Sequence, residues 1–310
     1  MGRHVAGDIP ELDQLVDDAC AAIGAEVDAL RIPRLAGVVL GGGYGRGEGG
    51  SVERKLSNDL DFFAVTGANE GDAATGPIAE ALKPVSEKWT AKLGVDVDFA
   101  VKTPWRLKHD EERIMVQELV RGYFDVAGKK GGEMFAHISQ RPAEAIPWME
   151  AARLMMNRGM GMLFAMEGAE KRGAGFVARN INKCVLGVGD ARLVARHAYA
   201  WRVEDRARAL GDELYGSAVE WKFRPQAEPV CSWDAACGYW FKALEEISGS
   251  EGKCRNLRNA ARWLVRRHSV GDLRTFGLDP VVRVLDGVAR HLRSRRPPDD
   301  ALMRDWTVFN

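Results

Sequence analysis

The sequence has few cysteines, and their spacing matches no common structural site. Its 310 residues include five cysteines, an odd number without a Cys-x-x-Cys pair. Neither a zinc cage nor a disulfide framework follows from this spacing. We therefore expect reduced thiols and a cytoplasmic protein.

A long apolar run and a net charge are also missing. No stretch approaches the roughly 18 uninterrupted apolar residues of a membrane span, and the N-terminus lacks an apolar core of signal-peptide length. The 44 basic and 44 acidic residues give a formal net charge of zero. We expect no membrane partner and no bulk, non-specific binding of nucleic acid.

The zero net charge conceals an uneven distribution. Residues 1–150 hold 17 basic and 25 acidic residues, a net of −8, so residues 151–310 carry +8. Eleven arginines between residues 255 and 296 supply much of the positive excess. The sequence leaves open whether these arginines bind an acidic partner or form the solvent-exposed face of helices. They include Arg266, Arg267, Arg293, Arg295 and Arg296.

Apolar periodicity predicts a mixed α/β first half. We expect helices over residues 11–30, 77–93 (with a kink at Pro84) and 109–121, and strands over 35–40, 59–65, 95–101 and 123–127. Alternating helices and strands of this kind indicate a mixed sheet with flanking helices.

The second half has helical periods and no convincing strand pattern. The expected helices cover residues 147–167, 176–187, 189–210, 233–247, 254–268 and 279–294. We therefore predict an α/β domain over residues 1–140 and an all-α helical-bundle domain over residues 141–310.

The glycine-rich stretch at residues 41–50 matches none of the common nucleotide-binding loops. Residues 45–50 spell G-x-G-x-x-G, but a polar loop and a strand follow where a dinucleotide fold needs a helix. The sequence has no Gly-Lys-Ser/Thr for a P-loop and no kinase His-Arg-Asp or Asp-Phe-Gly partner. A different kind of phosphate site is therefore expected.

Backbone freedom at the end of a strand would suit such a site. Gly41, Gly42 and Gly43 follow an apolar strand, and glycine allows the close approach and positive φ angles that let backbone N–H groups surround phosphate oxygens. Arg46 would add a cation, and Glu48 is expected to brace the loop.

Carboxylates come next along the chain. Asp59 and Asp61 lie two apart on an expected strand and so share one face. Asp98, or Asp96 as its substitute, supplies a third carboxylate from another strand. Oxygen ligands favour Mg²⁺ together with phosphate, and three of them indicate a two-metal site for phosphoryl transfer.

The order of these elements resembles the polymerase β-like nucleotidyltransferases. That family's pattern appears here as Val38-Val39-Leu40 with Gly42-Gly43, then Asp59-Leu60-Asp61-Phe62, and later Val97-Asp98-Phe99. The loop is similar to those of PII uridylyltransferases and antibiotic nucleotidyltransferases. The resemblance covers residues 35–102. Two departures are a slightly long spacer after Gly43 and Asn58 in the place of a common Ser.

The resemblance implies transfer of NMP from an NTP, for example ATP, to a hydroxyl acceptor, with release of pyrophosphate. The acceptor would be a small molecule or a protein. Asp59, Asp61 and Asp98 would be catalytic and hold two Mg²⁺. Two alternatives stay open: a non-catalytic module that binds NTP or a partner, such as an antitoxin-like protein, and a synthase that oligomerises or cyclises nucleotides.

The same resemblance implies nucleotide contacts from Gly42, Gly43, Arg46 and, in the helical half, Lys183. We expect Lys183 near the start of a helix, where free N–H groups can receive phosphate. Asp190 is expected to be an N-cap. Arg192 and His197 match the R-x4-H spacing of HEPN ribonucleases, a two-residue pattern with little weight.

Overall fold

The computed structural model describes residues 2–7, 9–68, 70–250 and 280–309. The chain divides into two compact units. One contains residues 1–141 with 223–225, and the other contains residues 142–222 with 226–310.

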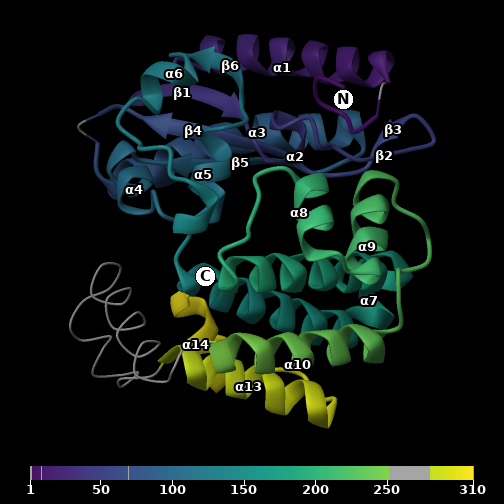
Figure 1. Ribbon diagram of the computed structural model, residues 1–310. Helices are drawn as coiled ribbons and strands as arrows, with labels where there is room; N and C mark the ends of the chain where they lie inside the picture. Colours follow the sequence, from purple (N-terminus) through teal and green to yellow (C-terminus); the bar gives the residue numbers. More distant parts are fainter. Residues whose placement is uncertain (1, 8, 69, 251–279, 310) are drawn as a thin grey trace. The chain divides into compact units, whose positions relative to one another are not determined.

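A four-stranded mixed sheet forms the centre of the first unit (Figure 1). Its strands are β1 (Leu35–Leu40), β4 (Leu60–Thr66), β5 (Val97–Lys102) and β6 (Phe124–Gly128), in the order β5-β4-β1-β6. β4 and β5 run parallel, whereas β1 is antiparallel to both β4 and β6. The expected mixed sheet with flanking helices is confirmed.

Both faces of this sheet are covered. Alternate residues of β4 point to opposite faces, so Phe62 joins the core under α1 (Pro10–Leu30) and α3 (Thr75–Leu93). Its neighbour Phe63 joins a second core with α4 (Pro104–His109), α5 (Ile114–Leu119) and α6 (Gly131–Met134). A strand with both faces buried is apolar almost throughout, and the aspartates therefore stand out.

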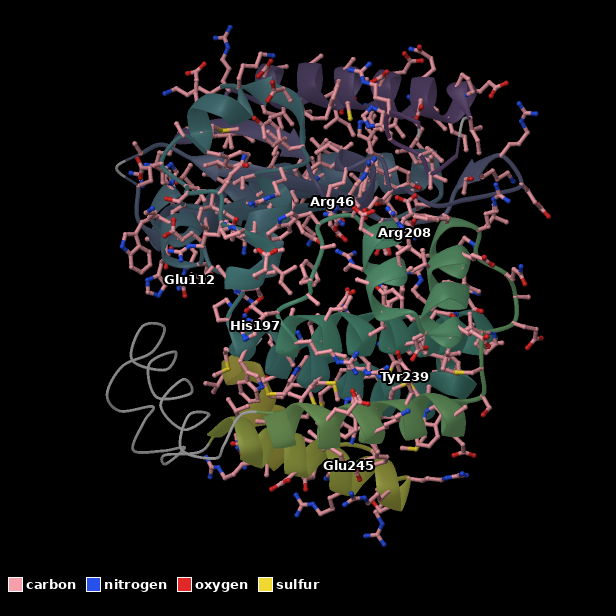
Figure 2. All side chains as sticks on the ribbon, viewed as in Figure 1. Arg46, Glu112, His197, Arg208, Tyr239 and Glu245 are labelled. Atoms are coloured by element: carbon pink, nitrogen blue, oxygen red, sulfur yellow. The ribbon has the colours of Figure 1, made fainter. Side chains whose placement is uncertain are left out.

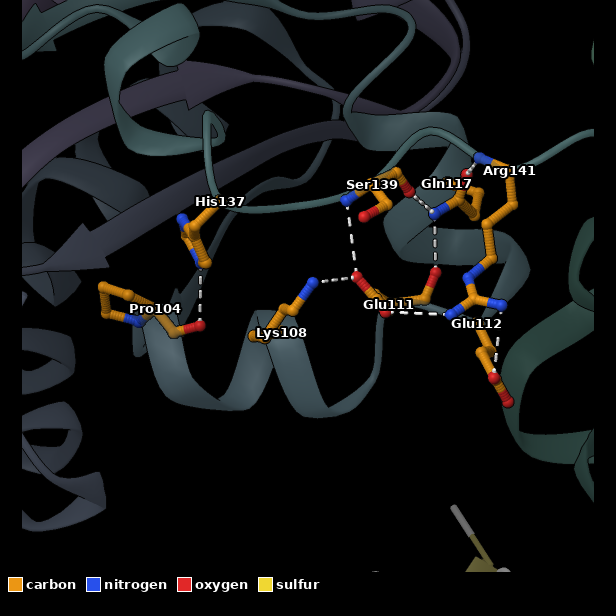
Figure 3. A network of polar contacts seen from close by, with 8 residues as sticks. All are labelled: Pro104, Lys108, Glu111, Glu112, Gln117, His137, Ser139 and Arg141. Atoms are coloured by element: carbon orange, nitrogen blue, oxygen red, sulfur yellow. Dashed lines mark hydrogen bonds and ion pairs between the residues drawn. The ribbon is translucent and has the colours of Figure 1, made fainter.

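The predicted helix over residues 109–121 is wrong in extent: its second half is helical as α5, but the chain turns between α4 and α5. Glu111 in this turn accepts hydrogen bonds from Lys108 Nζ (2.7 Å), Arg141 Nη2 (2.9 Å) and the Ser139 backbone N–H (3.3 Å). The buried Gln117 donates from Nε2 to the carbonyl oxygens of Glu111 and Ser139 (Figure 3). These long-range contacts hold the turn, and no local pattern contains them.

A short hairpin replaces the loop predicted before the first aspartate. β2 (Ser51–Val52) pairs with β3 (Lys55–Leu56), and both turn residues, Glu53 (φ +48°) and Arg54 (φ +60°), are left-handed. Two left-handed residues define the tight hairpin turn that Asn-Gly usually marks. The sequence Glu-Arg carries no such signal. Two 3-10 turns also lie in the described chain, Asp72–Ala74 and Ala143–Ala145.

The second unit is helical. Its long helix α7 (Trp148–Ala195) is broken at Gly173, where φ is +78° and ψ is 173°. The segments on either side of the break lie antiparallel: Gly168 is beside Phe176, and Gly187 is beside Arg158 (Figure 1). The expected helices over residues 176–187 and 189–210 are wrong in extent, because the second segment runs on to Ala195.

Five further helices follow α7 in the described part of the chain. They are α8 (Val203–Leu210), α9 (Glu213–Phe223), α10 (Trp233–Ser250), α13 (Pro280–Ser294) and α14 (Asp300–Phe309). α10 and α13 pack against α7. The expected helix over residues 254–268 lies outside the described residues. Within those residues, no helix has the length and apolar character that crossing a membrane requires.

Candidate functional site

The glycine loop follows β1 directly and folds into the single-turn helix α2 (Gly42–Gly45). The Gly41 N–H donates to the carbonyl oxygen of Asp61 (2.8 Å), and the Gly45 N–H donates to Gly41 O (2.8 Å). The Gly41 N–H therefore belongs to the contact with β4. It does not line a phosphate site as the sequence predicted.

Gly42 brings the backbone of this loop up against a carboxylate. Its φ angle is +59°, a left-handed conformation that suits glycine. A Cβ atom at this position would overlap Asp61 Oδ2. Two independent constraints therefore require glycine here, and Gly43 continues the same turn.

The register of β4 and β5 places the aspartates. Asp61 is the direct partner of Asp98 in the parallel pair, and neighbouring strands lie about 4.8 Å apart. Asp59 immediately precedes β4, and Asp96 immediately precedes β5, with its carbonyl oxygen accepting from the Leu60 N–H (2.8 Å). Strand register thus places Asp61 and Asp98 side by side, and Asp59 and Asp96 each stand two residues before them along the chain.

The charges of these aspartates act on one another. Burial raises the pKa of the Asp98 carboxyl, and the negative charges of Asp96 and Asp59 raise it further. Like charges that gather in this way attract a cation, and carboxylate oxygens are the donors that Mg²⁺ prefers. Among the described residues, however, no three His, Cys, Asp or Glu side chains are arranged to hold a metal ion.

Arg46, labelled in Figure 2, is engaged by two carboxylates. Its Nη1 lies 3.2 Å from Glu118 Oε2, and its Nη2 lies 3.5 Å from Glu48 Oε2. Glu48 is only 2% exposed. Gly122 permits this placement, because a Cβ there would overlap the Arg46 side chain. The structure thus holds Arg46 and Glu48 together as a brace within the loop.

Sequence reasoning missed Tyr44, which lies between glycines in α2. Its side chain is fully buried, and its hydroxyl contacts the backbone on both sides of the β2–β3 hairpin. The residue type could have indicated this role, since a large aromatic side chain among glycines needs a core in which to pack.

The helical unit places Lys183 and Asp190 differently from the sequence expectation. Lys183 is exposed, and it lies about two turns into the second segment of α7, where backbone N–H groups bond within the helix. Asp190 is also inside α7, so the predicted N-cap is wrong. Its carboxylate accepts from Tyr215 OH (2.6 Å) and pairs with Arg206 Nε (3.1 Å).

The R-x4-H pair has a structural use. Arg192 is buried and forms a two-pronged contact from Nε and Nη2 to Glu246 (2.9 and 3.2 Å), with Nη1 donating to Asp212 and Tyr239. His197 Nδ1 lies 3.1 Å from the Glu144 carbonyl oxygen. His197 and Tyr239 are labelled in Figure 2.

Two of the C-terminal arginines have partners in the described chain. Arg295 Nη2 donates to Asp234 (2.6 Å), and the Arg293 guanidinium lies 4.8 Å from the centre of the Phe241 ring. Arg266 and Arg267 lie outside the described residues. The two described contacts are those of a helix surface.

Comparisons with known proteins include a likeness to a solved structure. No family model matches the sequence, and no curated protein matches it. Among solved structures, the crystal structure of spectinomycin adenyltransferase AAD(9) from Enterococcus faecialis with ATP and spectinomycin is similar, with a TM-score of 0.38 and 13% identity. The match covers 74% of this chain and 97% of that chain.

Proposed function

We propose that this protein is a nucleotidyltransferase, which moves NMP from an NTP to a hydroxyl acceptor and releases pyrophosphate. The observation that carries the proposal is the parallel register of β4 and β5, with Asp61 beside Asp98 and Asp61 against the backbone of Gly42. A glycine turn and neighbouring carboxylates on one sheet face form a surface that a metal-bound triphosphate can approach.

The proposed metal is Mg²⁺, held by Asp59, Asp61 and Asp98, with Asp96 as the substitute for Asp98. The donor type fits, because carboxylate oxygens are the hard ligands that Mg²⁺ prefers, although no three of the described side chains are already arranged to hold the ion. Two bound Mg²⁺ ions would supply the positive charge that a triphosphate and its transition state require.

The residues of the chain have distinct proposed roles. Asp59 and Asp61 orient the phosphates, and Asp98 accepts the proton of the acceptor hydroxyl. The hydroxyl oxygen forms a bond to the α-phosphorus, the bond between that phosphorus and the bridging oxygen breaks, and pyrophosphate leaves.

Gly42 and Gly43 contribute room for the nucleotide at the turn. Arg46 and Lys183 are the proposed cations for the phosphates. For Arg46 this role adds to its contacts with Glu48 and Glu118, since a guanidinium has five N–H donors.

The test uses each of the four NTPs, labelled at the α-phosphate, with Mg²⁺ and with or without cell extract. We expect pyrophosphate release, with the label transferred to a small molecule or to a protein. Label in products made from NTP alone would instead indicate an oligomerising or cyclising synthase.

Variants decide whether the aspartates are responsible. Asp59→Asn and Asp61→Asn should abolish turnover, whereas Asp28→Asn, an exposed aspartate of α1, should not change it. Turnover that survives in both site variants contradicts the proposal. Tight binding of Mg-NTP without any release of pyrophosphate indicates a binding module.

A further inference from the structure

Tyr44 is anchored inside the glycine loop by its ring. The side chain is fully buried and belongs to the core that packs under α1 and α3. The ring lies against Gly49, where a Cβ atom would overlap it. Its backbone carbonyl oxygen lies 3.1 Å from Nδ1 of the buried His4. The residue is therefore held at both its main chain and its side chain.

The Tyr44 hydroxyl uses its whole hydrogen-bonding capacity. It donates to the Gly50 carbonyl oxygen (2.8 Å) and accepts from the backbone N–H groups of Ser57 (3.2 Å) and Asn58 (3.3 Å). A phenol has one donor and two acceptor positions. One hydroxyl thus joins the residue before the β2–β3 hairpin to the two residues after it.

The Asn58 side chain adds another hydrogen bond where the two ends of the β2–β3 hairpin meet. Its Oδ1 accepts from the Gly50 N–H (2.5 Å). Both polar backbone atoms of Gly50 are therefore tied to the segment at residues 57–58. Asp59 is the next residue, so the position of its backbone follows from these ties between Gly50 and residues 57–58.

The hydroxyl stays protonated as this arrangement requires. Burial raises the pKa of Tyr44 to about 12, and the charge of Asp59 adds to the increase. At neutral pH the Tyr44 hydroxyl therefore keeps the proton that it donates to the Gly50 carbonyl oxygen.

We propose that Tyr44 is a positioning residue, whose hydroxyl sets the Asp59 carboxylate at the place where it acts together with Asp61 and Asp98. Asp61 is located by strand pairing and by Gly42, but Asp59 lies outside β4 and has no such register. The Tyr44 hydroxyl holds the two residues that precede Asp59. This inference rests on the proposed function, because it assigns Asp59 to binding of Mg-NTP.

The test is Tyr44→Phe, which keeps the ring and removes only the hydroxyl. Tyr123→Phe is the matched control, because Tyr123 is half-buried in the same unit and its hydroxyl makes no hydrogen bond among the described residues. The first readout is amide hydrogen exchange. The Asn58 amide should exchange about fivefold to tenfold faster in Tyr44→Phe, since it loses a hydrogen bond of typical net strength. The Ser57 amide should change less, because it also donates to the Gly50 carbonyl oxygen (3.2 Å).

The second readout is equilibrium binding of Mg-ATP and of Mn²⁺ alone, with the other three Mg-NTPs in parallel. We expect Tyr44→Phe to weaken binding about tenfold, with the NTP KM raised more than kcat is lowered, and Tyr123→Phe to bind as the wild type does. Faster exchange with unchanged binding overturns the inference, as does unchanged exchange. If Tyr44→Phe does not fold, Asn58→Ala is measured in its place, because it removes the hydrogen bond between the Gly50 N–H and the Asn58 side chain.

Asp61→Asn separates this inference from the proposed function. If Asp61→Asn loses binding while Tyr44→Phe retains it, only the positioning role is overturned. If Asp61→Asn binds every Mg-NTP as the wild type does, the proposed function fails.

Discussion

The carboxylate of Asp61 occupies the space that a side chain on Gly42 would need. Gly42 is also left-handed, with φ +59°. The Asp61 carboxylate and the turn of the glycine loop are thereby in contact, although 19 positions separate Gly42 from Asp61 in the chain. The proposed chemistry depends on this contact, and single substitutions can perturb it in predictable ways.

Gly42→Ala should displace Asp61 and weaken binding of Mg-NTP severely. A left-handed alanine costs about 1 kcal/mol, and the overlap with Asp61 Oδ2 adds to that cost. Gly94→Ala is the matched control, because Gly94 has φ +72° and nothing within 4 Å of its Cβ position. Denaturant unfolding and Mg-ATP titration of both variants provide the measurement. Equal stability losses and equal binding in the two variants would contradict the overlap.

Asp98→Asn should remove turnover and raise stability at neutral pH. The folded-state pKa of Asp98 is raised, so its ionisation opposes folding as pH rises through that pKa. The amide cannot ionise, and the gain should therefore vanish in acid, where the carboxyl is protonated in both states. Thermal unfolding of the two proteins across pH 3–7 (about the titration range of carboxyls) measures this difference. A stability loss at neutral pH would contradict the predicted sign.

The acid limb of the pH–rate profile should respond to Asp96. Asp96 contributes to the raised pKa of Asp98, so Asp96→Asn should shift the acid limb to lower pH while retaining turnover. If Asp96→Asn abolishes turnover and Asp98→Asn does not, Asp96 is the third carboxylate of the site. Steady-state rates at saturating NTP provide the comparison.

Arg46→Met should destabilise the protein by about 3–5 kcal/mol, because it leaves the buried Glu48 and the half-buried Glu118 without their cation. Arg54→Met is the control: its pair with Glu11 is exposed, and such pairs contribute less than about 1 kcal/mol. Urea unfolding measures both. Unchanged stability together with lost NTP binding would indicate that Arg46 serves the phosphates alone.

Glu111→Gln should remove part of the acid sensitivity of the first unit. Burial alone would raise the pKa of Glu111, but hydrogen bonds from Lys108, Arg141 and the Ser139 N–H lower it to about 2. The depressed pKa gives stability that is present above the ordinary range near 4.5 and is lost as pH falls towards 2. Glu80→Gln, on the exposed face of α3, is the control. Equal acid unfolding of wild type and Glu111→Gln would contradict this expectation.

Local patterns were sufficient for most of the sheet. The apolar runs predicted β1, β4, β5 and β6 within about two residues. The central strands β1 and β4 are buried over most of their length and are therefore apolar nearly throughout. The same patterns missed the β2–β3 hairpin, whose left-handed turn residues are Glu53 and Arg54. They also missed the break at Gly173 that reverses α7, since an isolated glycine is tolerated inside many helices.

For the site, the sequence by itself predicted that Asp59 and Asp61 share one face, because strand geometry alternates with a period of two, whereas in the structure Asp59 immediately precedes β4. Only the tertiary structure decided that Asp98 is the register partner of Asp61 and that Arg46 is held between Glu48 and Glu118. Strand register and ion pairing join residues distant in the chain, and their energy comes from packing and charge that exist only after folding. The contacts of the Tyr44 hydroxyl with Gly50, Ser57 and Asn58 belong to the same class.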